Sequence, residues 1–336
     1  MRHALLSLAA SLPLLAPAEA AKLRVPKDHA TIQAAIDAAG PGDVVLVSKG
    51  TYFEELSISK TDLTVQAKKG HVVVVDAGGD GRPLGVVFSA NVTVKGLRFR
   101  NTADDVGIGV AVSSDVVLKK CRVEDVPNGH GIEVGAATVS LVKCRVEDVG
   151  GDGIRVGTND ASVSGCVVRD VGGAGISVLG ARVRVEGNTV ERSGAAGVRV
   201  GNDVTGAVEI EVVDNDVTAA DGAGVHVAAD AADAFVRSNS CRDGADAGFH
   251  YDGAGATFEG NLARANAGAG FAVSATGTGG AFLSNKAKKG LGDGFHVQGV
   301  ANSFVGNKAK KNAGLPLNDE TDEGDNTYDG NSFDPD

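Results

Sequence analysis

A glycine followed by an apolar residue, any residue and a second apolar residue recurs about every 22 positions through most of this 336-residue chain. Each repeat holds two or three short segments in which apolar and polar side chains alternate, joined by Gly, Asn and Asp. Such alternation predicts strands with one buried face, and the period leaves no room for a crossover helix. The repeat therefore predicts a parallel β-solenoid in which each coil stacks on the previous one. The motif begins at Gly109, Gly131, Gly153, Gly175, Gly197, Gly224, Gly248, Gly270, Gly294 and Gly314.

Several side chains recur at the same place in successive repeats, as stacked coils require. We expect two columns of stacked rings in the core, formed by Phe258, Phe282 and Phe304 and by Phe249, Phe271 and Phe295. An Asn column can join its amides from coil to coil and satisfy the turns; it comprises Asn188, Asn215, Asn239, Asn261, Asn285 and Asn307. Three earlier repeats carry Cys121, Cys144 and Cys166 there, which we expect to be buried thiols, with a Cys121–Cys144 disulfide as the alternative. The redox state of the fourth cysteine, Cys241, is left open.

The two ends of the chain differ from the repeats. Residues 1–20 have a basic start, an Ala- and Leu-rich stretch and an Ala-x-Ala cleavage site, which predicts a signal peptide and a secreted or periplasmic protein. Residues 21–43 contain an amphipathic stretch from Thr31 to Ala39, which predicts a short capping helix. Residues 44–317 then form the solenoid, and 318–336 an acidic tail in which Tyr328 and Phe333 could close a partial coil. No apolar run is long enough for a transmembrane segment.

One stretch of the chain carries a family resemblance. Thr31-Ile32-Gln33-Ala34-Ala35-Ile36, followed by Pro41-Gly42-Asp43, Gly50-Thr51-Tyr52 and Glu54, resembles the N-terminal signature of pectin-lyase-like right-handed β-helix proteins. The Gly-x-Gly-Ile-x-Val and Gly-Asn units resemble the parallel β-helix repeats of that superfamily, which includes NosD-type accessory proteins. The resemblance covers about residues 24–317 and implies an all-β, single-stranded right-handed parallel β-helix. Because the superfamily hosts lyases, hydrolases, esterases, epimerases and proteins without known chemistry, it implies no particular activity.

The middle residue of each motif points outward, so these residues form a surface column. In this column, Arg199 could neutralise a uronate carboxylate while His226 or His250 removes the proton on the carbon next to that carboxylate. This is the chemistry of a lyase or an epimerase. Arg155 and His296 are assigned to substrate binding on the same column. A soft divalent metal on the two histidines and an ordinary solvated face are the alternatives. The column reads Ala111, Glu133, Arg155, Ser177, Arg199, His226, His250, Ala272 and His296.

Two further columns carry charge. Asp125, Asp148 and Asp170 follow near-identical units and could share a calcium ion, or could instead cap their own turns. Arg264, Lys288 and Lys310, with Lys289 and Lys311 beside them, could bind an acidic polysaccharide or could simply be solvated.

Composition narrows the choice of ligand. The net charge of −11 gives no basic footprint for nucleic acid. The chain has no Trp and three Tyr, so it lacks the aromatic platforms that suit neutral sugars. We therefore expect a monomeric β-helix that binds an anionic polysaccharide or a cell-surface partner without chemistry. The alternatives are a uronate lyase or epimerase and a NosD-like accessory protein in metal delivery.

Overall fold

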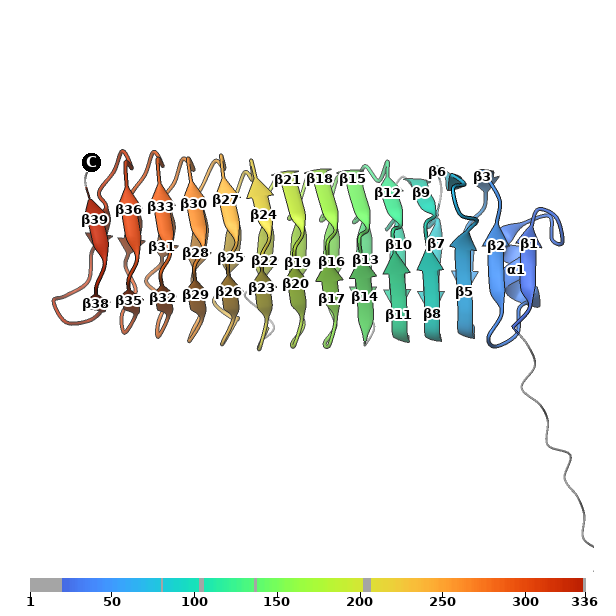
Figure 1. Cartoon of the computed structure of the whole chain (residues 1–336), viewed down its shortest axis with the longest axis horizontal. Helices are drawn as coiled ribbons and strands as arrows, with labels where there is room; N and C mark the ends of the chain where they lie inside the picture. Colours follow the sequence, from blue (N-terminus) through green and yellow to red (C-terminus); the bar gives the residue numbers. More distant parts are fainter. Residues whose placement is uncertain (1–19, 80, 103–105, 136–137, 202–206, 335–336) are drawn as a thin grey trace, which may run out of the picture.

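The chain folds into a long, narrow stack of coils, each built from short strands that pair in parallel with the coils before and after it (Figure 1). This computed structural model describes residues 20–79, 81–102, 106–135, 138–201 and 207–334. Three sheets of 14, 13 and 12 strands run the length of the stack, and we name them sheets A, B and C. The parallel solenoid predicted from the repeat is confirmed.

Sheet A contains β1 (Lys22–Val25), β2 (Val44–Val47), β5 (Thr61–Ala67), β8 (Ala90–Lys95), β11 (Ser114–Lys119), β14 (Val139–Val142), β17 (Ser162–Ser164), β20 (Arg184–Glu186), β23 (Glu211–Val213), β26 (Phe235–Arg237), β29 (Thr257–Glu259), β32 (Ala281–Leu283), β35 (Ser303–Val305) and β38 (Thr327–Asp329). Sheet B contains β3 (Gly50–Phe53), β6 (Val73–Gly79), β9 (Arg98–Thr102), β12 (Arg122–Glu124), β15 (Arg145–Val149), β18 (Val167–Val171), β21 (Thr189–Ser193), β24 (Asp216–Thr218), β27 (Ser240–Arg242), β30 (Leu262–Arg264), β33 (Lys286–Lys288), β36 (Lys308–Lys310) and β39 (Ser332–Asp334). Sheet C contains β4 (Leu56–Ile58), β7 (Leu84–Val87), β10 (Ile108–Ala111), β13 (Ile132–Gly135), β16 (Ile154–Val156), β19 (Ile176–Val178), β22 (Val198–Val200), β25 (Val225–Val227), β28 (Phe249–Tyr251), β31 (Phe271–Val273), β34 (Phe295–Val297) and β37 (Leu317–Asp319).

The interior is filled by the apolar residues of all three sheets, and the two predicted phenylalanine columns are confirmed within it. Phe249 stacks on Phe271 with ring centroids 4.8 Å apart, and Phe282 stacks on Phe304 at 4.7 Å. These separations match the rise of one coil, because in-register parallel strands place identical side chains directly above one another. The rings are fully buried.

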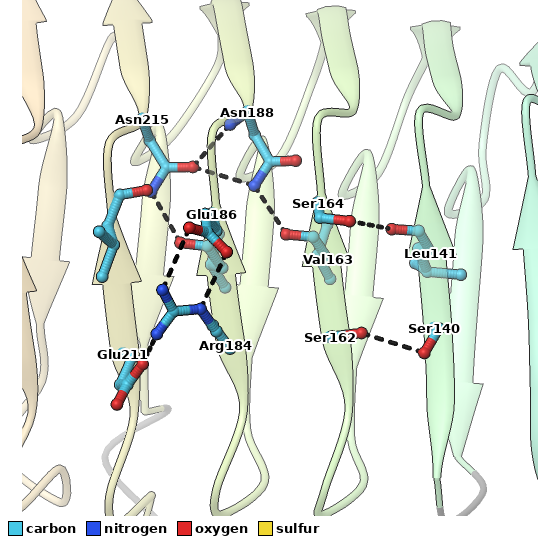
Figure 2. Close-up of polar contacts among 12 residues, drawn as sticks. Ser140, Leu141, Ser162, Val163, Ser164, Arg184, Glu186, Asn188, Glu211 and Asn215 are labelled. Atoms are coloured by element: carbon cyan, nitrogen blue, oxygen red, sulfur yellow. Dashed lines mark hydrogen bonds and ion pairs between the residues drawn. The ribbon is translucent and has the colours of Figure 1, made fainter.

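The predicted asparagine column forms a continuous buried ladder, and Figure 2 shows the part of it between Asn188 and Asn215. The side chain of Asn188 donates to Val163 O at 2.9 Å and to Asn215 Oδ1 at 2.9 Å. The same oxygen accepts the backbone N–H of Asn188, so each rung satisfies turn groups of the preceding coil. Each side chain therefore joins two neighbouring coils with no water between them.

Cys121, Cys144 and Cys166 extend this ladder toward the N-terminus, whereas Cys241 lies on β27 in register with Val217. All four are buried free thiols, and the ladder meets them where the N–H of Cys166 donates to Asn188 Oδ1. The Cys144 thiol donates to Leu118 O at 3.3 Å, much as each ladder asparagine donates to a carbonyl of the preceding coil. The structure thus has thiols at these positions and no Cys121–Cys144 disulfide.

At the N-terminal end, α1 (Ile32–Ala38) begins after Thr31, whose hydroxyl accepts the Ala34 N–H. The Glu54 carboxylate accepts the N–H groups of Ile32 and Gln33, both at 2.9 Å, so a residue of the next coil caps the helix start. The predicted helix is therefore present, whereas its role as a cover for the first coil stays a prediction. The signal-peptide prediction concerns residues 1–19, which lie outside the described residues, and residue 20.

At the C-terminal end the structure corrects the sequence analysis. The predicted acidic tail is part of the solenoid, since β37, β38 and β39 extend all three sheets as far as Asp334. Tyr328 stacks on Phe304 with centroids 5.0 Å apart and continues that phenylalanine column, whereas Phe333, in register with Ala309 on sheet B, lies 5.5 Å from Phe295. Composition alone suggested a tail because acidic turn residues outnumber these few inward-facing aromatics.

Candidate functional site

The outward column predicted from the repeat runs along sheet C. Arg155, Ser177, Arg199, His226 and His250 occupy equivalent positions on β16, β19, β22, β25 and β28. Strand alternation buries their neighbours and turns these five side chains away from the core.

The first member of the column was assigned wrongly. Glu133 pairs with Gly109, whereas Ala111 pairs with Gly135 at the end of the same strand. The repeat in this coil begins at Gly107, since both Gly107 and Gly109 open a segment that fits the motif. A shift of two residues preserves the inward and outward alternation, so the sequence pattern cannot distinguish the two choices.

The middle of the column forms the floor of a groove of about 450 Å³. Its lining includes all three predicted catalytic residues, Arg199, His226 and His250, together with Arg155. Asp152 and Asp246, which the sequence analysis did not single out, also line it. The 27-residue interval between Gly197 and Gly224 includes residues 202–206, which are outside the described residues.

The two central histidines share one carboxylate, that of Asp252. His226 Nε2 lies 2.7 Å from Asp252 Oδ2, and His250 Nε2 lies 3.1 Å from Oδ1. The two imidazole rings are 5.0 Å apart between centroids, one coil rise. An ionised carboxylate accepts from both Nε2–H groups, which leaves each Nδ1 of a neutral ring as the free basic nitrogen.

The shared carboxylate changes the titration of the pair. Burial alone would raise the pKa of Asp252, but hydrogen bonds from His226, His250 and Ser274 hold it well below its usual value. The hydrogen bond to Asp252 raises the pKa of His250, burial opposes that rise, and the negative charges of Asp252 and Asp246 add to it. The site therefore favours an ionised Asp252 beside a His250 that keeps its proton to a higher pH than an ordinary histidine does.

Arg155 lies at the other end of this groove in a mixed environment. Its Nη1 is 3.0 Å from His130 Nε2, and its Nε is 3.9 Å from Glu133 Oε1. The opposite ring nitrogen of His130 accepts the N–H of Asp152 at 2.9 Å, so the ring is fixed by the backbone of the following coil. His130 therefore lies beside Arg155 and not on the outward column itself.

His296 belongs to the same column but lies outside the groove. It occupies the outward position of β34, two strands beyond β28. Its Nδ1 is 3.4 Å from Asp293 and its Nε2 is 3.1 Å from Glu320, so both nitrogens face carboxylates.

The basic column lies on a different face. Arg264, Lys288 and Lys310 are exposed and in register on β30, β33 and β36 of sheet B, so the structure does not bring them together with the sheet C groove. Lys286 and Lys308 form a second exposed column on the same strands, which the sequence analysis did not connect with them. Within the described residues, none of these five cations forms a salt bridge, whereas further along sheet B Arg169 pairs with Glu191 at 2.9 Å.

The aspartates proposed for calcium lie where strands of sheet B end: Asp125 directly follows β12, and Asp148 and Asp170 are the last residues but one of β15 and β18. Asp125, Asp148 and Asp170 have φ angles of 58°, 57° and 53°, the left-handed conformation that aspartate tolerates in turns. Asp170 is also held by Arg192, whose Nη2 donates to Oδ2 at 2.8 Å. In the part of the chain that the structure describes, no three metal-ligating side chains converge. Calcium at these residues and metal delivery by the whole protein therefore stay predictions.

Asp252 is the main site residue that sequence reasoning missed. It lies two positions after His250, at the point where β28 ends and the chain turns. A residue one alternation beyond an outward histidine faces the same side, which is the signal that could have found it.

Across the described residues, no helix has the length and apolar character needed to cross a membrane.

Comparison with solved structures finds the same fold in proteins of low sequence identity. A PL6 family polysaccharide lyase from Pseudopedobacter saltans has a TM-score of 0.72 at 13% identity, covering 93% of this chain and 92% of that one. A mannuronan C-5 epimerase A-module from Azotobacter vinelandii has a TM-score of 0.71 at 17% identity, covering 90% and 93%. The Dettilon tailspike protein has a TM-score of 0.69 at 14% identity, covering 92% of this chain and 68% of that one.

Comparison with curated protein sequences finds no match. The family model described as a right handed beta helix region matches residues 54–217 and 174–333, which together span most of the chain. With the three parallel sheets and the stacked asparagine ladder, this match shows that the chain belongs to the right-handed parallel β-helix family.

Proposed function

We propose that this protein is exported and binds an anionic polysaccharide along the groove of sheet C. The observation that carries the proposal is the groove itself, in which Arg155 and Arg199 lie on a straight outward column with His226 and His250. Guanidinium groups bind carboxylates through two parallel hydrogen bonds. A line of such groups along a rigid solenoid suits an extended polymer better than a compact ligand.

Two further observations support a polysaccharide. The lyase and the epimerase that share this fold act on polysaccharides, as their names state. Among the described residues that line the groove there is no tyrosine or phenylalanine, so they do not offer the stacking surface that neutral sugars favour.

The proposal is tested by calorimetric titration of the chain from Ala21 onward with polymannuronate and with the same polymer after reduction to its neutral form. We expect the charged polymer to bind and the neutral one not to bind. The double variant Arg155→Ser/Arg199→Ser should weaken binding by about a hundredfold, since each lost charge-assisted contact contributes about 1.5 kcal/mol or more.

A matched control removes the same charge elsewhere. Lys95 and Lys119 are exposed and in register on sheet A, so Lys95→Gln/Lys119→Gln also removes two positive charges but leaves the groove intact. Equal weakening by both double variants would mean that only net charge matters, and would overturn the groove as the binding site. Loss of binding in Lys288→Gln/Lys310→Gln alone would assign the polymer to sheet B.

The shared carboxylate favours a second candidate function, a lyase or an epimerase acting on uronates. Asp252 orients His226 and His250, and Arg199 precedes His226 in register on the adjacent coil. With Arg199 on the uronate carboxylate, a free Nδ1 could take the proton next to it. In a lyase the electron pair forms a C4–C5 double bond, the C4–O bond breaks, and the leaving oxygen takes a proton. In an epimerase the carbon is reprotonated from the opposite face.

This second candidate has its own readouts. Elimination gives an unsaturated product that absorbs in the ultraviolet, and epimerisation in D₂O places deuterium at C5, which NMR detects. We expect His226→Gln to abolish either signal while binding of the polymer persists. Binding by the wild-type protein with neither signal would exclude this chemistry and leave recognition alone.

A further inference from the structure

The two arginines of the sheet C column lie two coils apart, and His250 lies two coils beyond the second of them. Arg155, Arg199 and His250 lie on β16, β22 and β28, and the coil between each pair presents Ser177 or His226. Because parallel strands are about 4.8 Å apart, the spacing between successive charged positions is about 10 Å. Beyond the groove the column presents Ala272 and then His296, whose ring nitrogens face Asp293 and Glu320.

A fourth charged group extends the series toward the N-terminus. The outward residue of β10 is Gly109, and the space above it is occupied by the guanidinium of Arg82. A Cβ at Gly109 would lie 2.5 Å from Arg82 Nη1, so this position must be glycine for the guanidinium to lie against the strand. Gly109 is two coils before Arg155, with Glu133 between them. Arg82 therefore supplies the charge at the coil where the period requires it.

Three neighbouring hollows lie over these positions. A hollow of about 500 Å³ over β4 and β7 and one of about 240 Å³ over β10 and β13 are both lined by Arg82. The second hollow shares Arg155 and Leu179 with the 450 Å³ groove that ends at His250. From β4 to β28 there are eight coil steps, so the three hollows together extend over about 40 Å of sheet C.

We propose that the spacing of the basic side chains on this surface matches the repeat of its ligand. Arg82, Arg155, Arg199 and His250 then each bind one anionic group, on every second sugar of an extended polysaccharide. In an extended 1,4-linked chain with two-fold symmetry, successive sugars face opposite sides, and each advances by roughly one coil. Carboxylates directed at the protein then recur every second sugar. The inference rests on the proposed function and adds to it the repeat of the ligand and the role of Arg82.

The test moves one charge without removing it. The exchange Ser177→Arg/Arg199→Ser keeps composition and net charge but places the guanidinium one coil from Arg155 instead of two. We expect calorimetry with polymannuronate to show binding at least tenfold weaker than wild type, as weak as in Arg199→Ser alone. Arg199→Lys, which keeps the charge in place, should lose less. Thermal unfolding of each variant checks that the solenoid remains folded.

The period also predicts how affinity depends on ligand length. With mannuronate oligosaccharides lengthened one sugar at a time, affinity should rise in steps at every second sugar, and Arg82→Ser should remove the last step only. A smooth rise with every sugar, or full binding by the exchange variant, would overturn the period while the proposed function stands. Absence of any binding by the wild-type protein would instead refute the proposed function itself.

Discussion

Replacing Asn239 with alanine removes one rung from the middle of the asparagine ladder. Its Oδ1 accepts the backbone N–H and the side-chain amide of Asn215, both at 2.9 Å, and its amide donates to Val212 O at 2.8 Å. The Asn215 amide keeps a bond to Val185 O, but the backbone N–H of Asn215 loses its acceptor. A buried unsatisfied group costs about 1–3 kcal/mol, and with the weakened network we expect a loss of about 2–4 kcal/mol.

Urea unfolding followed by circular dichroism measures this change, which should lower the midpoint by about 1 M for a slope of about 3 kcal/mol/M. Hydrogen exchange at the Asn215 amide should accelerate more than exchange elsewhere. Asn239→Cys should cost less than alanine, because a thiol can still donate as Cys166 does to Leu141 O at 3.7 Å. A change below about 0.5 kcal/mol, typical of a surface site, would refute the reasoning.

Two further predictions concern titratable groups. Because the pKa of His250 is raised in the folded protein, this group stabilises the fold fully below the ordinary histidine pKa of about 6.5, and the stabilisation is lost as pH rises through the folded pKa. Because the pKa of Asp252 is lowered, this group stabilises the fold above its ordinary pKa of about 4, and that stabilisation is lost in acid. The melting-temperature gap between wild type and His250→Gln should therefore peak between those values; a gap independent of pH would contradict the shared carboxylate. Burial raises the pKa of the Cys241 thiol, so a thiol reagent should label this residue only after the protein unfolds. The other three cysteines are also buried and should behave in the same way, and labelling of the native protein would contradict their burial.

The repeat made most of the fold predictable, because stacking in register converts a sequence period directly into columns in space. The phenylalanine columns and the asparagine ladder follow from that period alone. Even the error at Gly109 had little effect on the site, since a two-residue shift keeps the same face outward. What the period could not predict was the last coil, whose acidic turns outweigh its few inward-facing residues.

The candidate site was predictable only in part. Arg199, His226 and His250 were assigned to one column and do lie together in one groove. Asp252 was missed because it lies in the turn after the strand, and the contacts of Arg82 with Gly109 depend on where a long side chain reaches across a coil. Arg264, a predicted binding residue, lies on another sheet, because a repeat gives the order of positions around a coil but not which sheets form one surface.

The central claim is that sheet C carries the polysaccharide. Hydrogen exchange of the chain with and without polymannuronate, resolved by peptide, tests it most directly. We predict slower exchange across β16, β19, β22, β25 and β28, with β30, β33 and β36 of sheet B unchanged. Protection confined to the sheet B strands, or none at saturating polymer, would contradict the claim.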